Sequence, residues 1–227
     1  LHSFLQKKSI PFESVMSKVW NNKIFKHIQT NVDAASKKLS DERGACPDAE
    51  EYGFKERFSN KTAIAPTASI SIICGGASPG VEPVAANSYT HKTLSGSYNV
   101  RNRYLKKILA KNGRDDVETW SSITTNQGSV EHLDFLSDHE KAVFKTAFEI
   151  DQKWIIELGA DRTTYISQAQ SINIFLPADV HKKELHQIHF QAWKKGLKSL
   201  YYCRSKSIQR AENINSGSST DVKLNVY

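Results

Sequence analysis

The order of apolar patterns between residues 137 and 203 constrains the fold of this chain more than any other feature. The order begins with a capping box, in which the Ser137 hydroxyl can accept the backbone N–H of Glu140 and the Glu140 carboxylate can bond the N–H of Ser137. Apolar residues then recur at helical spacing as far as Gly159. This pattern predicts a single helix of roughly 21 residues, about 30 Å long.

A second helix and two strands are expected after this helix. The residues predict a turn at 160–162, a strand at 171–176 that Pro177 ends, a helix at 179–195 capped by Gly196, and a strand at 197–203. Helices therefore alternate with strands that are apolar enough to be buried. That alternation predicts an α/β fold.

The N-terminal half predicts mainly helices and turns. Apolar residues at three- and four-residue spacing predict a long amphipathic helix at 12–43 that ends at Gly44, followed by a loop with a short helical turn at 45–63. Residues 84–100 predict either an irregular excursion or a short hairpin around Ser95 and Gly96. A short helix from Tyr104 closed by Gly113 is expected next.

Two further expectations concern irregular parts of the chain. Residues 114–136 predict connecting turns that Trp120 and Ile123 anchor in the core. The folded unit is expected to span residues 1–204. Residues 205–227 are expected to be a mobile tail, because their composition turns to Ser, Asn, Gly and Lys.

The segment at residues 60–83 combines a Pro-Thr-Ala-Ser turn, an apolar run from Ile70 and the pair Gly75-Gly76. One interpretation is a turn whose hydroxyls and backbone N–H groups bind an anion such as a phosphate. The other is an ordinary Ser/Thr turn that leads into a buried core strand. The segment by itself leaves both interpretations open.

Composition limits the classes of partner. The formal net charge is +7, but the lysines form isolated doublets rather than a clustered stripe, so nucleic-acid binding is not favoured. No window approaches ~18 consecutive apolar residues, and no membrane span is expected. The three cysteines form no C-x-x-C pair, which predicts neither a zinc site nor a disulfide framework and fits a reducing, cytoplasmic location.

Histidines and tyrosines offer few sites for chemistry. His186 and His189 are spaced as metal ligands on a helix can be, but no third ligand lies nearby, so no metal site is predicted. Tyr201 and Tyr202 adjoin in a predicted strand, where they are expected to point to opposite faces. They can serve as aromatic packing or, because a phenol can lose an electron and a proton, as steps of a redox relay.

Four stretches follow one another in a fixed order along the chain: Glu42-Arg43-Gly44-Ala45-Cys46-Pro47, Pro66-Thr67-Ala68-Ser69-Ile70-Ser71 with Gly80-Val81-Glu82-Pro83, Gln168-Ala169-Gln170-Ser171-Ile172-Asn173, and Gly196-Leu197-Lys198-Ser199-Leu200-Tyr201-Tyr202. In this order they resemble the C-terminal part of the large, catalytic subunit of class I aerobic ribonucleoside-diphosphate reductase. The resemblance implies the later part of a ten-stranded α/β barrel, incomplete on its own.

The resemblance also implies roles for particular residues. The loop residues Pro66, Thr67, Ala68, Ser69 and Ile70 would bind the substrate diphosphate. Tyr201 and Tyr202 would relay a radical to an active-site cysteine. The radical originates in a small subunit with a tyrosyl radical and a metal centre, and the reaction replaces the ribose 2′-hydroxyl of a nucleoside diphosphate with hydrogen.

Departures from the family pattern imply that the chain is inactive alone. The family's radical cysteine and its turnover disulfide lie upstream of the region matched, so Cys46, Cys74 and Cys203 take no catalytic role. The C-terminal cysteine pair that exchanges electrons with thioredoxin or glutaredoxin has no counterpart in residues 216–227. The chain is expected to need an N-terminal large-subunit part and the small subunit. The alternative is a non-enzymatic nucleotide-binding or regulatory fragment.

Overall fold

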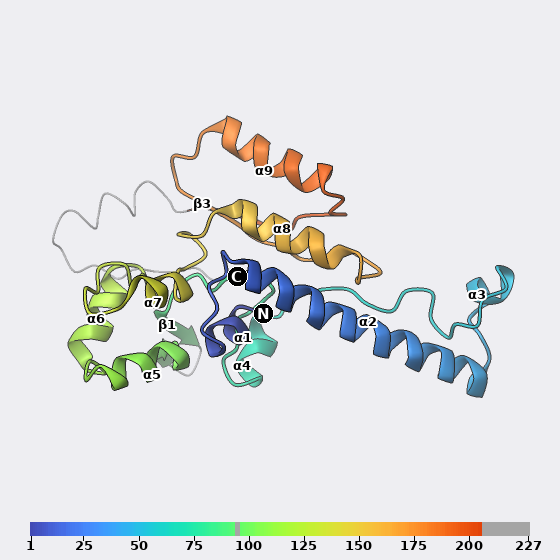
Figure 1. The fold of residues 1–227 in the computed structure, drawn as a ribbon, viewed down its shortest axis with the longest axis horizontal. Helices are drawn as coiled ribbons and strands as arrows, with labels where there is room; N and C mark the ends of the chain where they lie inside the picture. The colour runs from blue at the N-terminus through green and yellow to red at the C-terminus, as the bar shows by residue number, and fades with distance from the viewer. Residues whose placement is uncertain (94–95, 206–227) are drawn as a thin grey trace.

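The computed structural model describes residues 1–93 and 96–205 as an elongated array of helices with a few short strands (Figure 1). The elements in chain order are α1 (His2–Lys7), α2 (Val15–Arg43), α3 (Pro47–Glu51), α4 (Ala68–Ile73), β1 (Ser88–Thr93), β2 (Gly96–Arg101), α5 (Arg103–Lys111), α6 (Val117–Thr125), α7 (Asp138–Val143), α8 (Gln152–Thr163), β3 (Ile174–Leu176), α9 (Lys182–Lys194) and β4 (Cys203–Ser205). The predicted tail, apart from Ser205, lies outside the described residues.

The main core lies where α8 packs between α2 and α9 (Figure 1). Ile155, Ile156 and Leu158 of α8 are fully buried, and they share one cluster with Phe25 of α2 and Ile188 of α9. A second core joins α5, α6 and α7 at one end of the molecule. The mixed helix and strand composition confirms the predicted α/β class, and the described residues form no closed barrel.

The long N-terminal helix is confirmed as α2, which begins at Val15 after the N-cap Ser14 and ends at Gly44. Gly44 has a φ of 83°, a conformation in which residues with a side chain are strained. The burial of α2 differs from the amphipathic expectation. Val15 and Val19, which stand four residues apart in the apolar pattern of this helix, are exposed, whereas Phe25 is buried, so the described part of the chain leaves the start of this apolar face uncovered.

The prediction of connecting turns at residues 114–136 was wrong in part, because α6 lies within them. Asp116 caps this helix through its Oδ1, which accepts the N–H of Thr119 at 2.7 Å. Trp120 and Ile123 are buried, as the prediction of two anchors required. The missed signal was an Asp N-cap followed by apolar residues three apart.

The single helix predicted from Ser137 to Gly159 was also wrong, although the capping box at Ser137 is confirmed. The chain leaves the helix after Val143 and re-enters one at α8, which continues through the predicted turn at 160–162. Tertiary bonds account for the break. The carbonyl of Phe144 accepts the Asn87 side-chain amide at 2.6 Å, and the N–H of Ala147 donates to the carbonyl of Val84 at 2.8 Å.

The interpretation of the apolar run from Ile70 as a buried core strand, one of the two left open, was wrong. Residues Ala68–Ile73 form the short helix α4, and Ile70, Ile72 and Ile73 are exposed. Local bonds favour the helix, since Ser71 donates its N–H to the Thr67 carbonyl at 2.8 Å and its hydroxyl to the Ala68 carbonyl at 2.6 Å. The apolar run therefore lies on the surface of the described chain.

The hairpin alternative for residues 84–100 is confirmed by the antiparallel pair β1 and β2. The predicted turn at Ser95 lies outside the described residues, while Gly96 opens β2. The strand predicted at 171–176 is confirmed as the shorter β3, and the helix at 179–195 as α9. The last strand lies later than predicted, at β4, and it pairs with β3 in parallel.

A buried histidine joins the N-terminal segment to the rest of the fold. The Nδ1 atom of His2 accepts the N–H of Val84 at 3.0 Å, and its ring packs edge-on against Phe12. Burial, with a smaller contribution from the neighbouring α-amino group, lowers the pKa of His2 from 6.5 to about 3. His2 is thus neutral in the folded chain at pH values where an exposed histidine is charged.

This lowered pKa predicts acid sensitivity. Between pH 6.5 and 3 the unfolded chain binds a proton at His2 that the folded chain does not, so stability is complete above pH 6.5 and falls as the pH falls. We expect a loss of about 2 kcal/mol between pH 6 and 4.5, at ~1.4 kcal/mol per pH unit. Urea unfolding at the two pH values measures the loss, and His2→Gln, which keeps an acceptor for Val84, should reduce it sharply. An equal loss in both proteins would contradict this assignment.

Candidate functional site

The loop that was expected to bind a diphosphate is closed by Thr67. The Thr67 hydroxyl donates to the carbonyl of Pro79 at 2.7 Å, and the Thr67 N–H reaches the same carbonyl at 3.3 Å. Thr67 is the N-cap residue of α4, but its side chain does not cap the helix. The N–H groups of Ala68, Ser69 and Ile70 lie in the first turn of α4. In the first turn of an α-helix, the backbone N–H groups have no hydrogen-bond partner within the helix.

This geometry changes how the loop can act on an anion. Because the Thr67 hydroxyl donates to Pro79, it is not directed at a ligand in this structure. The donors that remain toward solvent are the first-turn N–H groups and the hydroxyl of the exposed Ser69. Pro66 and Ile70 are also exposed. Four of the five predicted loop residues are thus exposed, and Thr67 between them is partly buried.

The segment behind this loop pairs with the chain before β3. The N–H of Ile64 donates to the carbonyl of Ala169 at 3.2 Å, and the N–H of Ser171 donates to the carbonyl of Ile64 at 2.9 Å, in a parallel arrangement. The loop at Pro66 follows directly. This pairing positions the loop at the end of a strand-like segment.

The tyrosines pair with the opposite edge of that middle segment. Tyr201 donates its N–H to the carbonyl of Ile172 at 2.8 Å, and Ile174 donates its N–H to the carbonyl of Tyr202 at 2.9 Å. Successive residues of a strand direct their backbone groups to alternate edges. Residues 169 and 171 therefore face the loop segment, and residues 172 and 174 face the tyrosines. Three parallel segments thus lie side by side, in the order 62–64, 169–176, 201–205.

Tyr201 and Tyr202 contact each other, and the prediction that they point to opposite faces of a strand was wrong. Their ring centroids are 4.1 Å apart with 53° between the ring planes, and the side chains are about half exposed. The two residues precede β4 and do not continue its regular pleat. The phenols are therefore placed as neighbours that can exchange an electron directly.

The two phenols also interact electrostatically. A side-chain hydrogen bond with Tyr202, reinforced by the charge that Tyr202 carries when ionised, raises the pKa of Tyr201. The Arg204 guanidinium lies 5.6 Å from the centroid of the Tyr202 ring, a cation–π distance. The raised pKa keeps the Tyr201 phenol protonated at neutral pH, so it can give up an electron together with a proton.

Two polar residues that the sequence did not single out, the buried Glu82 and the partly buried Asn173, connect the loop to the tyrosines. Glu82, which follows Pro79 closely, accepts the Asn173 side-chain amide at 2.5 Å through Oε1. Asn173 in turn accepts the N–H of Tyr202 at 3.4 Å. Both residues stand in stretches that carry the family resemblance, but no spacing rule assigns them a role. Only the fold brings them together.

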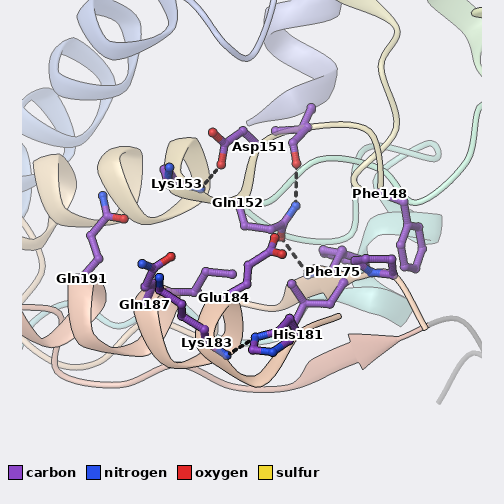
Figure 2. Close-up of a pocket in the computed structure, with 14 residues that line it drawn as sticks. Phe148, Asp151, Gln152, Lys153, Phe175, His181, Lys183, Glu184, Gln187 and Gln191 are labelled. Atoms are coloured by element: carbon purple, nitrogen blue, oxygen red, sulfur yellow. Dashed lines mark hydrogen bonds between the residues drawn. The ribbon is translucent and has the colours of Figure 1, made fainter. Parts of the chain in front are cut away.

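A groove lies elsewhere, between α8, α9 and the end of β3 (Figure 2). Its volume is about 560 Å³. Gln152 forms its floor, because this buried side chain donates to the Ala147 carbonyl at 2.9 Å and accepts the Phe175 N–H at 2.8 Å. Figure 2 shows His181 and Lys183 at one side of it, joined by a 3.1 Å bond that caps α9. None of the predicted site residues lines this groove.

Among residues 1–93 and 96–205, no three side chains of the metal-binding types His, Cys, Asp and Glu are gathered as a metal ion requires. None of the helices in these two ranges is both long enough and apolar enough to cross a lipid bilayer.

The three parallel segments, with helices packed beside them, define the chain as part of an α/β barrel domain. Residues 47–203 match the family described as ribonucleotide reductase, barrel domain. The chain belongs to this ribonucleotide reductase family, as the four stretches of resemblance predicted. The expectation of a barrel that is incomplete in this chain is confirmed with it.

Individual ribonucleotide reductase subunits are similar to this chain over most of its length. The chain is 51% identical over 219 residues to the ribonucleoside-diphosphate reductase large subunit of Invertebrate iridescent virus 6, covering 95% of this chain and 23% of that protein. It is 41% identical over 222 residues to the large subunit of Invertebrate iridescent virus 3, covering 96% and 35%. The solved alpha subunit of the class Id ribonucleotide reductase of Actinobacillus ureae superposes with a TM-score of 0.84 at 40% identity, covering 96% of this chain and 39% of that one. The chain thus spans well under half of each relative.

Proposed function

We propose that this chain supplies the diphosphate loop and the tyrosine relay of a class I ribonucleoside-diphosphate reductase. The observation that carries the proposal is the contact between Tyr201 and Tyr202, with ring centroids 4.1 Å apart, in a chain of this family. A relay needs oxidisable groups in direct contact, and two phenols at this separation meet that need. Substrates are ribonucleoside diphosphates, and products are the 2′-deoxyribonucleoside diphosphates used for DNA synthesis.

In the proposed binding mode, the loop at residues 66–70 holds the substrate diphosphate. First-turn N–H groups of Ala68, Ser69 and Ile70 and the Ser69 hydroxyl donate to phosphate oxygens, while Pro66 shapes the turn. The Thr67 hydroxyl contributes by fixing the loop against Pro79. The supporting observation is that these donors lie on consecutive exposed residues, directly after the segment that pairs in parallel with the chain before β3.

In the proposed relay, each tyrosine is oxidised by losing one electron and one proton and is reduced again when the hole moves on. The hole comes from a small subunit with a tyrosyl radical and metal centre and goes to a cysteine of the N-terminal large-subunit part. The ribose 2′-hydroxyl leaves as water, and a dithiol supplies the two electrons as it becomes a disulfide. Thioredoxin or glutaredoxin restores that dithiol. We place this reaction in the cytoplasm, where the three free cysteines fit a reducing environment.

Exposed apolar surface supports the requirement for an N-terminal part. Ile70, Ile72 and Ile73 of α4 and Val15 and Val19 of α2 are exposed on the described chain. Apolar residues gathered on a surface favour association, because each buried square ångström contributes about 25 cal/mol. We propose that the rest of a large-subunit barrel covers these faces.

Reconstitution tests the proposal. The chain is mixed with a separately expressed N-terminal large-subunit part, the small subunit, a dithiol reductant and CDP, and dCDP formation is measured. We expect dCDP from the complete mixture and none when any one protein is omitted. Light scattering shows whether the two large-subunit parts associate, and circular dichroism shows whether both are folded. If both conditions hold and no dCDP forms, the proposal that this chain and a separate N-terminal part together make the enzyme is excluded.

A second candidate is a non-enzymatic fragment that binds a nucleotide or regulates an intact subunit. The observation that favours it is the set of donors at residues 68–70, which can bind a phosphate without any radical chemistry. The neighbouring genomic sequence discriminates between the two. An adjacent reading frame that encodes the radical-cysteine strand supports the enzyme, and the lack of one supports the regulatory fragment.

A further inference from the structure

We propose that Glu82 is a positioning residue that, through Asn173, holds Tyr201 and Tyr202 in contact. The inference rests on the proposed relay for its functional consequence. The backbone at the tyrosines is irregular, the Asn173 side chain bonds the donor that this irregularity leaves over, and the buried Glu82 carboxylate orients Asn173.

The irregularity is a bulge. In a regular parallel ladder, one residue supplies both the N–H and the C=O that bond the two residues flanking its partner. Here Tyr201 supplies the N–H, to Ile172, and Tyr202 supplies the C=O, to Ile174. Two residues therefore stand opposite the single residue Asn173. A bulge of this kind redirects side chains, which explains why two consecutive tyrosines lie ring to ring rather than on opposite faces.

The bulge leaves one backbone donor, the N–H of Tyr202, without its ladder partner. The Asn173 side chain takes that place, since its Oδ1 accepts the Tyr202 N–H at 3.4 Å. An amide side chain has a second end that must also be oriented. That end, Nδ2, donates to Glu82 Oε1 at 2.5 Å. Glu82 therefore sets the direction in which Asn173 presents its oxygen to the tyrosine backbone.

Glu82 is itself buried against the backbone of Gly80. The residue is 5% exposed, and its carboxylate lies over Gly80, where an added Cβ would stand 2.6 Å from Oε2. Residues with a side chain can adopt the backbone conformation of Gly80. A side chain is disfavoured at this position because it would collide with the Glu82 carboxylate. The glycine leaves the room that the carboxylate occupies. This gives a second way to displace the carboxylate without touching the tyrosines or Asn173.

The test is ¹⁹F NMR of the full chain labelled with 3-fluorotyrosine, with the Tyr201 and Tyr202 signals assigned from Tyr→Phe variants. Ring contact makes each signal depend on the other ring. In Glu82→Ala and in Gly80→Ala we expect both signals to move toward the position of a solvent-exposed tyrosine, while the remaining tyrosine signals stay unchanged. Glu82→Gln, whose amide oxygen can still accept from Asn173, should restore both signals.

A matched control and a double variant sharpen the test. Glu149→Ala removes another hydrogen-bonded glutamate, one that accepts from Thr146 at 2.7 Å, and should leave the tyrosine signals in place. The double variant Gly80→Ala/Glu82→Ala should match Glu82→Ala alone, because both changes act on one carboxylate. In the reconstituted enzyme, Glu82→Ala should lower kcat about tenfold with the KM for CDP nearly unchanged.

The outcomes separate this inference from the proposed function. Unchanged Tyr201 and Tyr202 signals in Glu82→Ala, or a Glu82→Gln chain that behaves like Glu82→Ala, would overturn the positioning role. If Glu82→Ala unfolds the chain and shifts every signal, the comparison of Gly80→Ala with Glu82→Gln decides. A mixture that makes no dCDP with wild-type chain would refute the enzyme while the NMR result still stands.

Discussion

Tyr201→Phe and Tyr202→Phe are each expected to reduce dCDP formation in the reconstituted enzyme by about three orders of magnitude or more. Phenylalanine keeps the ring, so the 4.1 Å contact and the packing remain. It removes the hydroxyl and with it the group that can lose a proton and an electron at an accessible potential. A relay with one step missing must carry the hole over a longer distance, and turnover fails.

The measurement is initial-rate formation of dCDP, with CDP affinity followed separately by equilibrium binding. Affinity should stay within about twofold of wild type, because a hydroxyl outside the diphosphate loop contributes nothing to ground-state binding. Tyr98→Phe is a matched control, since Tyr98 on β2 is 53% exposed and Tyr202 is also 53% exposed. Turnover near the wild-type rate in either relay variant would rule out the redox role and leave aromatic packing as the function of the pair.

Arg162→Ala is expected to destabilise the fold by about 3–5 kcal/mol, the range for breaking a buried charged network. Arg162 is 1% exposed at the junction of α8, α2 and the segment before β3. Its Nε donates to Gln170 Oε1 at 2.6 Å and its Nη1 to Asn21 Oδ1 at 3.3 Å, and the guanidinium lies 5.7 Å from the Phe25 ring centroid. Truncation leaves two buried oxygens unpaired and opens a cavity.

The charge of Arg162 persists despite its burial. Desolvation lowers the pKa of Arg162 from 12.5 to about 10, opposed by the negative charges of Glu82 and Asp161, so the guanidinium remains protonated at neutral pH. Urea unfolding at pH 7.5 measures the loss. Arg162→Lys should recover less than half of it, because one ammonium cannot bridge Gln170 and Asn21 as a planar fork does. A loss below about 1 kcal/mol in Arg162→Ala would show that this network contributes little.

Local sequence signals predicted several features correctly because they depend on neighbours along the chain. The Ser137 capping box places a helix start, since donor and acceptor are three residues apart and meet in any helix there. Gly44 ends α2 for a similar reason, as its positive φ is a property of one residue. Local patterns also predicted the strand before Pro177, and they gave the hairpin at residues 84–100 as one of two alternatives.

Errors arose where a distant segment competes for the backbone. The helix predicted as far as Gly159 breaks because Ala147 bonds Val84 and Phe144 accepts from Asn87, and no local pattern reports those partners. Gly159 was predicted to end a helix, whereas it lies inside α8. It is a glycine there because Ile172 and Leu197 approach so closely that a Cβ would stand 2.9 Å from Ile172 Cδ1.

For the candidate site, the sequence by itself predicted which residues carry the chemistry, and the tertiary structure decided how those residues are arranged. The residue types of the loop at 66–70 and the adjacent tyrosines point to anion binding and redox chemistry, because hydroxyls, N–H groups and phenols carry that chemistry in any fold. That Thr67 closes the loop on Pro79, and that Tyr201 and Tyr202 lie ring to ring, was decided by contacts between segments far apart in the chain. A period-two strand would have separated the rings, and the bulge opposite Asn173 brings them together.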